Sequence, residues 1–198
     1  MSFLRTALVS AGLLLLGGCS SFVTGMGESA NAALEEALQV GVDGFESADV
    51  PAPPSRICGS SSDRGPEVDA TLRQPASAGY TDGDAELHVW AWRSDSAQEV
   101  VDRAVDGSDA CEQEIYADYD TDGDGQLDAG SHTVTTAGRY DRNGWTGVAV
   151  GTEEDGDPTV VTRYVRMGDV VVLVTLTGGG DDANATVDDY LEAVGAAL

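Results

Sequence analysis

The sequence predicts an α+β fold, with an antiparallel meander sheet of about five strands and helices packed mainly on one face. Residues 133–177 consist of strand-like segments separated by turn signals, and residues 86–93 form a further alternating segment. Helical apolar spacing occurs outside this region, at about 29–40, 96–105 and 183–197. Strands joined by short turns, with helices placed elsewhere along the chain, are typical of α+β proteins.

The turns define the meander. Its strands are expected at 133–141, 145–152, 159–166 and 170–177. Asn143-Gly144 is a strong two-residue hairpin signal, because both central positions of that turn need positive φ. Gly168-Asp169 plays the same part for the last pair of strands. The last strand is almost wholly apolar, which predicts a central strand covered on both faces.

Two earlier segments complete the expected domain. In residues 86–93, alternation places Leu87, Val89 and Ala91 on one face of a strand and His88, Trp90 and Trp92 on the other. Residues 47–85 are rich in proline, serine, glycine and aspartate, so we expect an irregular segment there, held in place at Cys58.

The first eighteen residues have the pattern of a secretory signal peptide. Arg5 supplies a positive charge, residues 7–16 form an apolar run, and small residues precede Cys19. A membrane-spanning helix needs about 20 apolar residues, and this apolar run is shorter. The ending LGGC at 16–19 resembles the lipobox of bacterial lipoproteins. That resemblance implies cleavage before Cys19 and a lipid on its thiol, and the alternative is an ordinary signal peptide with a chance cysteine.

Lipidation would anchor the protein to the extracytoplasmic face of the cell membrane, so the membrane is one expected partner. Three segments follow: the lipoprotein signal peptide at 1–18, a lipidated tether with a short helix at 19–57, and the α+β globular domain at 58–198. Two or more acyl chains hold a protein on a membrane stably, because each buried CH₂ contributes about 0.8 kcal/mol.

The chain is strongly acidic. It has 35 acidic residues against 10 basic ones, all of them arginine, and a formal net charge of −25. Removal of residues 1–18, which carry only Arg5, makes the charge −26. Such a surface repels nucleic acid and anionic lipid, so nucleic acid is not an expected partner. A proteome-wide acidic bias is an alternative cause of the charge.

Cys58 and Cys111 remain after Cys19 is assigned to the lipid. An even pair in an oxidising compartment predicts a disulfide. The bridge would close a loop of about 54 residues and stabilise the fold by roughly 4 kcal/mol in the chain-entropy description. Two unpaired buried thiols are the alternative.

Residues 120–128 (DTDGDGQLD) partly match the EF-hand pattern of calcium ligands. The candidate ligands are Asp120, Asp122, Asp124, the backbone carbonyl of Gln126, and Asp128. Ser131 stands where the pattern has a bidentate glutamate, and only the preceding flank, 112–119, is compatible with a helix. Two interpretations stay open: a single calcium loop with a Kd of about 10⁻⁴ to 10⁻³ M, as in extracellular modules, or an acidic turn.

Other chemical signals are weak. The sequence has no GxSxG motif, no phosphate-binding glycine loop and no CxxC motif. His88 and His132 lack a sequence partner that suggests catalysis, so we interpret both as structural or surface residues. Trp90, Trp92 and Trp145 could line a ligand cleft, although aromatic residues on strands are core residues first.

The stretch RYVRMGDVVVLVTLTG at 163–178, after Cys111 and before an acidic terminal helix, resembles small actinobacterial lipoproteins. It is also similar to the extracellular sensor domain of some actinobacterial Ser/Thr kinases. The resemblance covers roughly 85–198 and rests on element order and one hairpin. It implies an antiparallel sheet flanked by helices around a cleft, with a binding or sensing role. Members often have four cysteines, whereas this domain has two.

The leading hypothesis is a membrane-anchored, non-enzymatic lipoprotein that binds a small ligand or an envelope protein. A structural or adhesive envelope module that binds calcium through Asp120–Asp128 is the alternative. A third hypothesis, an envelope hydrolase that uses carboxylates, rests only on the abundance of acidic residues.

Overall fold

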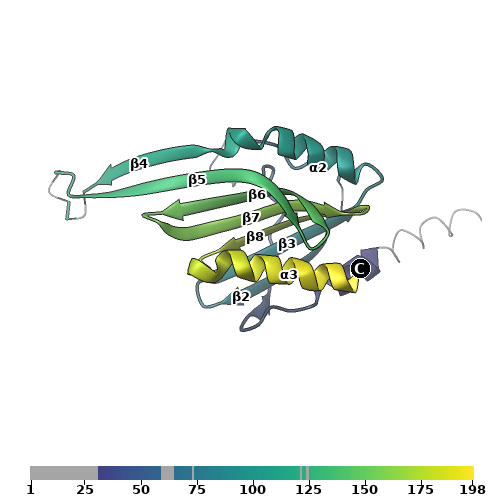
Figure 1. Cartoon of the computed structure of the whole chain (residues 1–198). Helices are drawn as coiled ribbons and strands as arrows, with labels where there is room; N and C mark the ends of the chain where they lie inside the picture. The colour runs from purple at the N-terminus through teal and green to yellow at the C-terminus, as the bar shows by residue number, and fades with distance from the viewer. Residues whose placement is uncertain (1–30, 59–64, 73, 121, 124) are drawn as a thin grey trace, which may run out of the picture.

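The computed structural model of the chain describes residues 31–58, 65–72, 74–120, 122–123 and 125–198. Its strands form one eight-stranded antiparallel sheet in the order β1-β2-β3-β8-β7-β6-β5-β4 (Figure 1). The strands are β1 (Glu46–Ala48), β2 (Ala76–Asp82), β3 (Ala85–Arg93), β4 (Gln113–Tyr119), β5 (Ala129–Arg142), β6 (Trp145–Glu154), β7 (Asp157–Met167) and β8 (Val170–Thr177). The prediction of a five-stranded meander with helices mainly on one face is therefore wrong.

The sheet joins two antiparallel runs. The strands β1 to β3 form the first run and β4 to β8 the second, and pairing of β3 with β8 joins them. The helix α2 (Ala97–Asp106) and a short 3₁₀ helix (Ser108–Cys111) carry the chain from β3 to β4, while α3 (Ala183–Ala197) follows β8. These two helices cover opposite faces of the sheet, because alternate residues of β8 pack in different cores. A central strand buried on both faces is the reason that β8 is almost wholly apolar.

The core under α3 fixes the N-terminal part of the described chain as well. Residues 31–38 are helical, and Leu34 and Leu38 are fully buried in this core. The hydroxyls of Tyr80 and Tyr190 both donate to the carbonyl oxygen of Leu38, at 2.6 and 2.9 Å. The segment therefore belongs to the globular body, although the sequence placed it in the tether.

The core under α2 contains the predicted disulfide. Cys58 and Cys111 are bonded, with their Cα atoms 5.3 Å apart. Both lie in the cluster that includes Ile57 and the buried face of α2. The bridge ties the segment before residue 58 to the start of β4, as the cysteine count predicted.

The hairpin turns are confirmed as well. Asn143 and Gly144 have φ of +52° and +81°, and Gly168 has φ of +60°. Two segments differ from expectation: β2 lies within 47–85, which was expected to be irregular, and 112–119 is mostly the strand β4 rather than a helix. In both cases the neighbouring strand decides the conformation, because local β propensity depends on pairing partners.

The hairpin of β4 and β5 extends beyond the rest of the sheet as an arm, with the acidic turn at its tip (Figure 1). β5 reaches along β6 for ten residue pairs, and its first residues pair only with β4. In the described part of the chain, no helix is long and apolar enough to cross a membrane.

Candidate ligand-binding groove

The sheet face under α2 is covered by that helix along only part of its length. Near α2 the side chains on this face are large and apolar, as in Val148, Tyr164 and Leu173. Two residues further along β7 and β8, the same face carries Thr162 and Thr175. The change from bulky to hydroxylated side chains leaves a hollow floored by the sheet.

Strand register gathers the hydroxyls in this hollow. Thr135 of β5 pairs with Thr152 of β6, and Thr162 of β7 pairs with Thr175 of β8. Thr175 in turn pairs with His88 of β3. Residues that face one another across antiparallel strands point to the same side of the sheet, so their side chains form one floor.

The hollow is a groove of about 700 Å³, a volume within the usual range of small-molecule sites. Its lining comes from six strands, β3 to β8, and from the segment before the disulfide. The described lining residues are Pro51, Ala52, Pro54, Arg56, Ile57, Cys58, His88, Trp90, Gln113, Ile115, Thr133, Thr135, Val150, Thr152, Val160, Thr162, Thr175 and Thr177.

The threonine hydroxyls on the floor keep hydrogen-bonding capacity for a ligand. The Oγ1 atoms of Thr135 and Thr152 are 3.1 Å apart, and those of Thr162 and Thr175 are 3.3 Å apart. A hydroxyl has one proton and two acceptor lone pairs. In each pair one proton is shared, so the second proton and the remaining lone pairs are available to a ligand in the groove.

The segment 51–58 forms one wall of the groove and is held at two points. The Trp90 Nε1 donates to the Pro51 carbonyl oxygen at 3.0 Å, and Cys58 is fixed by its disulfide to Cys111. Proline has a restricted φ, which lowers the entropy lost when this wall is ordered. The wall is therefore held in place before any ligand binds.

The groove differs in charge from the rest of the protein. No aspartate or glutamate occurs among its described lining residues, although the chain has 35 of them. Its ionisable side chains are Arg56 and His88. Arg56 donates to the carbonyl oxygen of Gly65 at 2.6 Å and to Glu67 at 2.9 Å, which fixes its position. The groove is thus close to neutral within a strongly anionic molecule.

Sequence patterns found only part of this site. Trp90 lines the groove, whereas Trp92 and Trp145 are buried in the two cores. His88, interpreted from sequence as a structural or surface residue, stands in the lining. The threonines were missed, although threonine recurs at alternate positions in 133–135 and 175–177, a spacing that places both hydroxyls on one face of a strand.

His132 lies outside the groove, on the arm. Its ring stacks on Tyr116 with centroids 4.3 Å apart, and its Nε2 is 2.8 Å from the Glu114 carboxylate. Its backbone N–H donates to Asp155 at 2.9 Å. These contacts hold the arm against the neighbouring turn, as expected of a structural histidine.

The predicted calcium loop forms the tip of the arm and connects two strands. The Asp120 carboxylate accepts hydrogen bonds from the backbone N–H groups of Asp122, Gly123 and Gly125, at 3.2, 2.7 and 2.7 Å. Among the described residues, no three acidic, histidine or cysteine side chains converge as a metal site, and Asp124 lies outside them. Calcium binding by Asp120, Asp122, Asp124, Gln126 and Asp128 stays a prediction.

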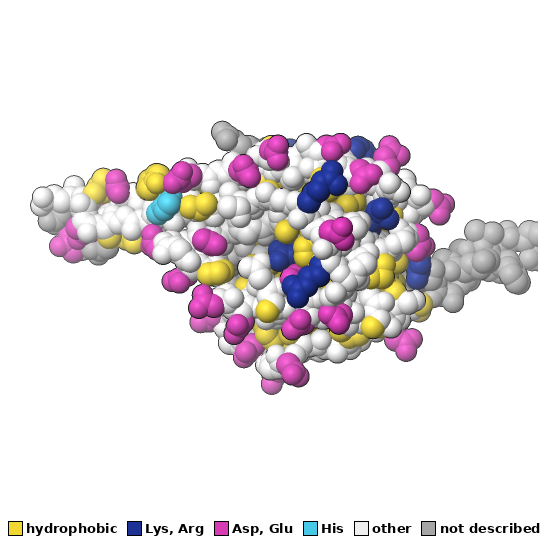
Figure 2. All heavy atoms as spheres, viewed as in Figure 1, with side chains coloured by type: hydrophobic (Ala, Val, Ile, Leu, Met, Phe, Trp, Pro, Cys, Tyr) yellow, Lys and Arg dark blue, Asp and Glu magenta, His cyan; other side chains and the backbone are white. Residues whose placement is uncertain are grey.

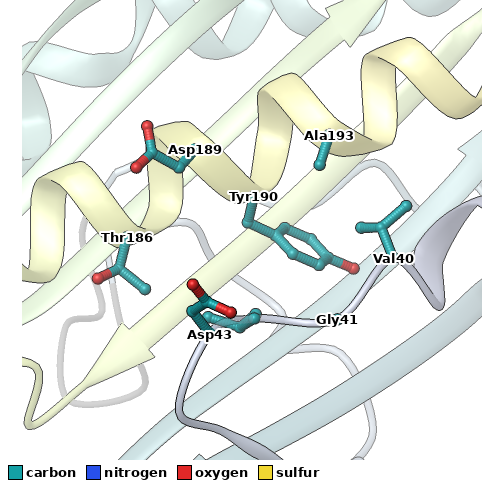
Figure 3. A pocket seen from close by; sticks show the side chains of 8 residues that line it. Val40, Gly41, Asp43, Thr186, Asp189, Tyr190 and Ala193 are labelled. Carbon is teal, nitrogen blue, oxygen red and sulfur yellow. The ribbon is translucent and has the colours of Figure 1, made fainter.

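A second hollow, of about 460 Å³, lies between residues 40–43 and α3. Figure 3 shows the Tyr190 ring reaching from α3 toward Val40, with Asp43 and Asp189 at the rim. The hydroxyl of Tyr190 is already bonded to the chain. The two carboxylates in its lining make this hollow a poorer small-molecule site than the threonine groove.

The predicted lipidation site, Cys19, lies outside the described residues. Comparison with known proteins adds no assignment: no protein-family model, curated protein or solved structure matches the chain.

Proposed function

We propose that this protein is a lipoprotein, anchored through Cys19 to the extracytoplasmic face of the cell membrane, that binds a small ligand in the threonine groove without catalysis. The observation that carries the proposal is the groove itself, a neutral cavity in a strongly anionic domain. The sequence at 16–19 supports the anchor.

The lining selects an amphipathic ligand. The lining includes the apolar side chains of Trp90, Val150 and Ile57, and the floor also presents paired threonine hydroxyls. A ligand with an apolar body and several hydrogen-bonding groups on one side would contact both surfaces. Pockets of this type fix their ligands by burial of apolar area and use a few polar groups for orientation.

The charge of the lining favours an uncharged ligand. Arg56 and His88 provide the only ionisable side chains of the described lining, and the Arg56 charge is already paired with Glu67. A cation finds no carboxylate to pair with among the described lining residues. A carboxylate pair for acid–base catalysis is likewise absent from the described lining, which favours binding over turnover.

Binding of the neutral amphipathic dye N-phenyl-1-naphthylamine to the purified protein tests this proposal. The fluorescence of the dye is expected to rise when the dye moves from water into the groove. Thr175→Glu places a carboxylate on the floor and is expected to abolish the rise. The matched control is Thr136→Glu, at an exposed position on the strand β5. Equal dye binding by both variants would contradict a ligand site in the groove.

A further inference from the structure

The strand β4 forms one edge of the sheet among the described strands. It has seven residues, whereas β1 at the opposite edge has three. Figure 1 shows β4 along the outer side of the arm. An edge strand presents a row of backbone N–H and carbonyl groups that can pair with another extended chain. A long edge strand on a projecting arm is well placed for such pairing, and a three-residue edge is not.

The side chains of β4 divide into an apolar face and an acidic face. Ile115 and Tyr119 lie on the side of the sheet that contains the groove, and they are 46% and 47% exposed. Glu114, Tyr116 and Asp118 alternate with them and lie on the other side. Figure 2 shows hydrophobic and acidic side chains next to one another on the projecting arm.

The acidic face is organised by contacts within the hairpin. The Tyr116 hydroxyl donates to Glu114 at 2.6 Å, and the Tyr116 ring stacks on His132 of β5. The hydrogen bonds from Tyr116 and His132 hold the pKa of Glu114 below its usual value. Glu114 is therefore an anion at neutral pH, in a fixed position beside a strongly exposed tyrosine.

A second copy of this chain does not suit the edge. Antiparallel pairing of two β4 strands would place the carboxylates of Glu114 and Asp118 on the same face of a continuous sheet in both copies. Like charges opposite one another across strands are destabilising, and each molecule carries a net charge of −25. The charge of the edge therefore selects a partner of opposite sign.

We propose that β4 is a docking strand for an extended segment of a basic partner protein in which Lys or Arg alternates with apolar residues. Such a segment would add a ninth strand beside β4. Its alternate side chains would then meet Ile115 and Tyr119 on one face, and Glu114 and Asp118 on the other. In this mode, main-chain hydrogen bonds supply affinity and the alternating side chains supply specificity.

Calorimetric titration of the purified protein with synthetic peptides tests the proposal. The probe is the capped peptide Lys-Val-Lys-Val-Arg-Val-Lys, and the comparison peptide has the same composition with its basic and apolar residues in separate blocks. We expect the alternating peptide to bind more tightly. Hydrogen exchange of the bound complex is expected to show new protection of alternate amides within residues 113–119. These are the amides whose N–H groups point away from β5 and become paired with the peptide.

A charge-reversed variant separates specific docking from general attraction. Glu114→Lys with Asp118→Lys is expected to weaken binding of the basic peptide by about tenfold, since two attractive cross-strand pairs become repulsive. It is expected to bind instead an acidic peptide in which Glu replaces each Lys and Arg of the probe. The control, Asp102→Lys with Asp106→Lys, makes the same charge change at exposed positions of α2 and is expected to behave like the original protein.

Four results would overturn the proposal. Equal affinity for the alternating and block peptides would show that net charge alone drives binding. Equal loss of affinity in the β4 and α2 variants would also show that net charge alone drives binding. Binding without protection of the β4 amides, or absence of binding by the basic peptide, would show that the edge is not the docking strand.

Discussion

Asp188 of α3 and Arg163 of β7 form an ion pair that is buried between the helix and the sheet. The Arg163 Nε lies 3.3 Å from the Asp188 Oδ1, and the two residues are 5% and 7% exposed. The Tyr140 hydroxyl and Arg142 Nη1 also donate to the Asp188 carboxylate, at 3.1 and 2.5 Å. Arg163 donates further to Asn184 at 2.7 Å. These contacts fix α3 on the sheet in one position.

The Asp188→Ala variant is expected to lose about 3 to 5 kcal/mol of unfolding free energy, because Arg163 is left as a buried charge without its carboxylate. Urea unfolding followed by circular dichroism measures the change. The control is Asp189→Ala, at an exposed neighbouring position, which is expected to change the free energy by less than about 0.5 kcal/mol. Similar midpoints for the two variants would show that the buried pair does not hold α3.

The Tyr140 hydroxyl predicts loss of stability in alkali. Burial and the nearby Asp188 carboxylate raise the pKa of Tyr140 from 10.0 to about 12. Between these values the unfolded chain releases the phenol proton and the folded chain keeps it, so the free energy of unfolding falls as pH rises from 10 towards 12.

Urea midpoints at pH 8, 10 and 11 measure this fall. Tyr140→Phe is expected to be less stable at pH 8, because it lacks the hydrogen bond to Asp188, and to show a shallower decline above pH 10. Burial also raises the pKa of Tyr190, so part of the decline is expected to remain. An unchanged slope in Tyr140→Phe would contradict the assignment of this effect to Tyr140.

Reduction of the disulfide is expected to affect both stability and the groove. The Cys58–Cys111 bridge spans 53 positions of the sequence, and loss of a bridge of that span costs about 4 kcal/mol in the chain-entropy description. Cys58 also ends the wall 51–58 of the groove. The Cys58→Ser, Cys111→Ser double variant should therefore melt at lower temperature and bind N-phenyl-1-naphthylamine more weakly at temperatures where it is folded. Unchanged dye affinity in the folded variant would show that the bridge does not shape the groove.

Sequence patterns predicted those parts of the fold that depend on local signals. Alternation of apolar and polar residues predicted the strands β5 to β8. Residues that accept positive φ predicted the β5–β6 and β7–β8 hairpins. The strand β2 (ASAGYTD) was missed because its own residues favour turns, and only pairing with β3 makes it a strand. The two-sided burial of β8 was predicted, whereas the placement of the helices mainly on one face was wrong, because α2 and α3 pack on opposite faces.

The groove could not be predicted because it depends on register. Thr135 and Thr175 are 40 positions apart in the sequence, and they share a floor only because β5, β6, β7 and β8 pair as they do. The disulfide was predictable, since two remaining cysteines in one domain have a single way to pair. The calcium loop was visible as a motif, whereas its geometry depends on the strands that carry it.

Calcium binding at the tip of the arm is the last prediction, and the chain provides its own control. The tripeptide Asp122-Gly123-Asp124 at the tip recurs as Asp82-Gly83-Asp84 in the turn between β2 and β3. If the tip is a calcium loop, calorimetric titration is expected to give a Kd of about 10⁻⁴ to 10⁻³ M. Asp122→Asn with Asp124→Asn is expected to abolish the heat, and Asp82→Asn with Asp84→Asn to leave it unchanged.

The hydrogen bonds from the backbone N–H groups of Asp122, Gly123 and Gly125 to the Asp120 carboxylate favour this outcome, because they fix these residues around it before an ion arrives. A loop ordered in advance loses less conformational entropy on binding. Equal heats in the two double variants would show that calcium associates with the acidic surface in general. Absence of heat in the original protein would leave Asp120 as the residue that closes an acidic turn through its backbone contacts.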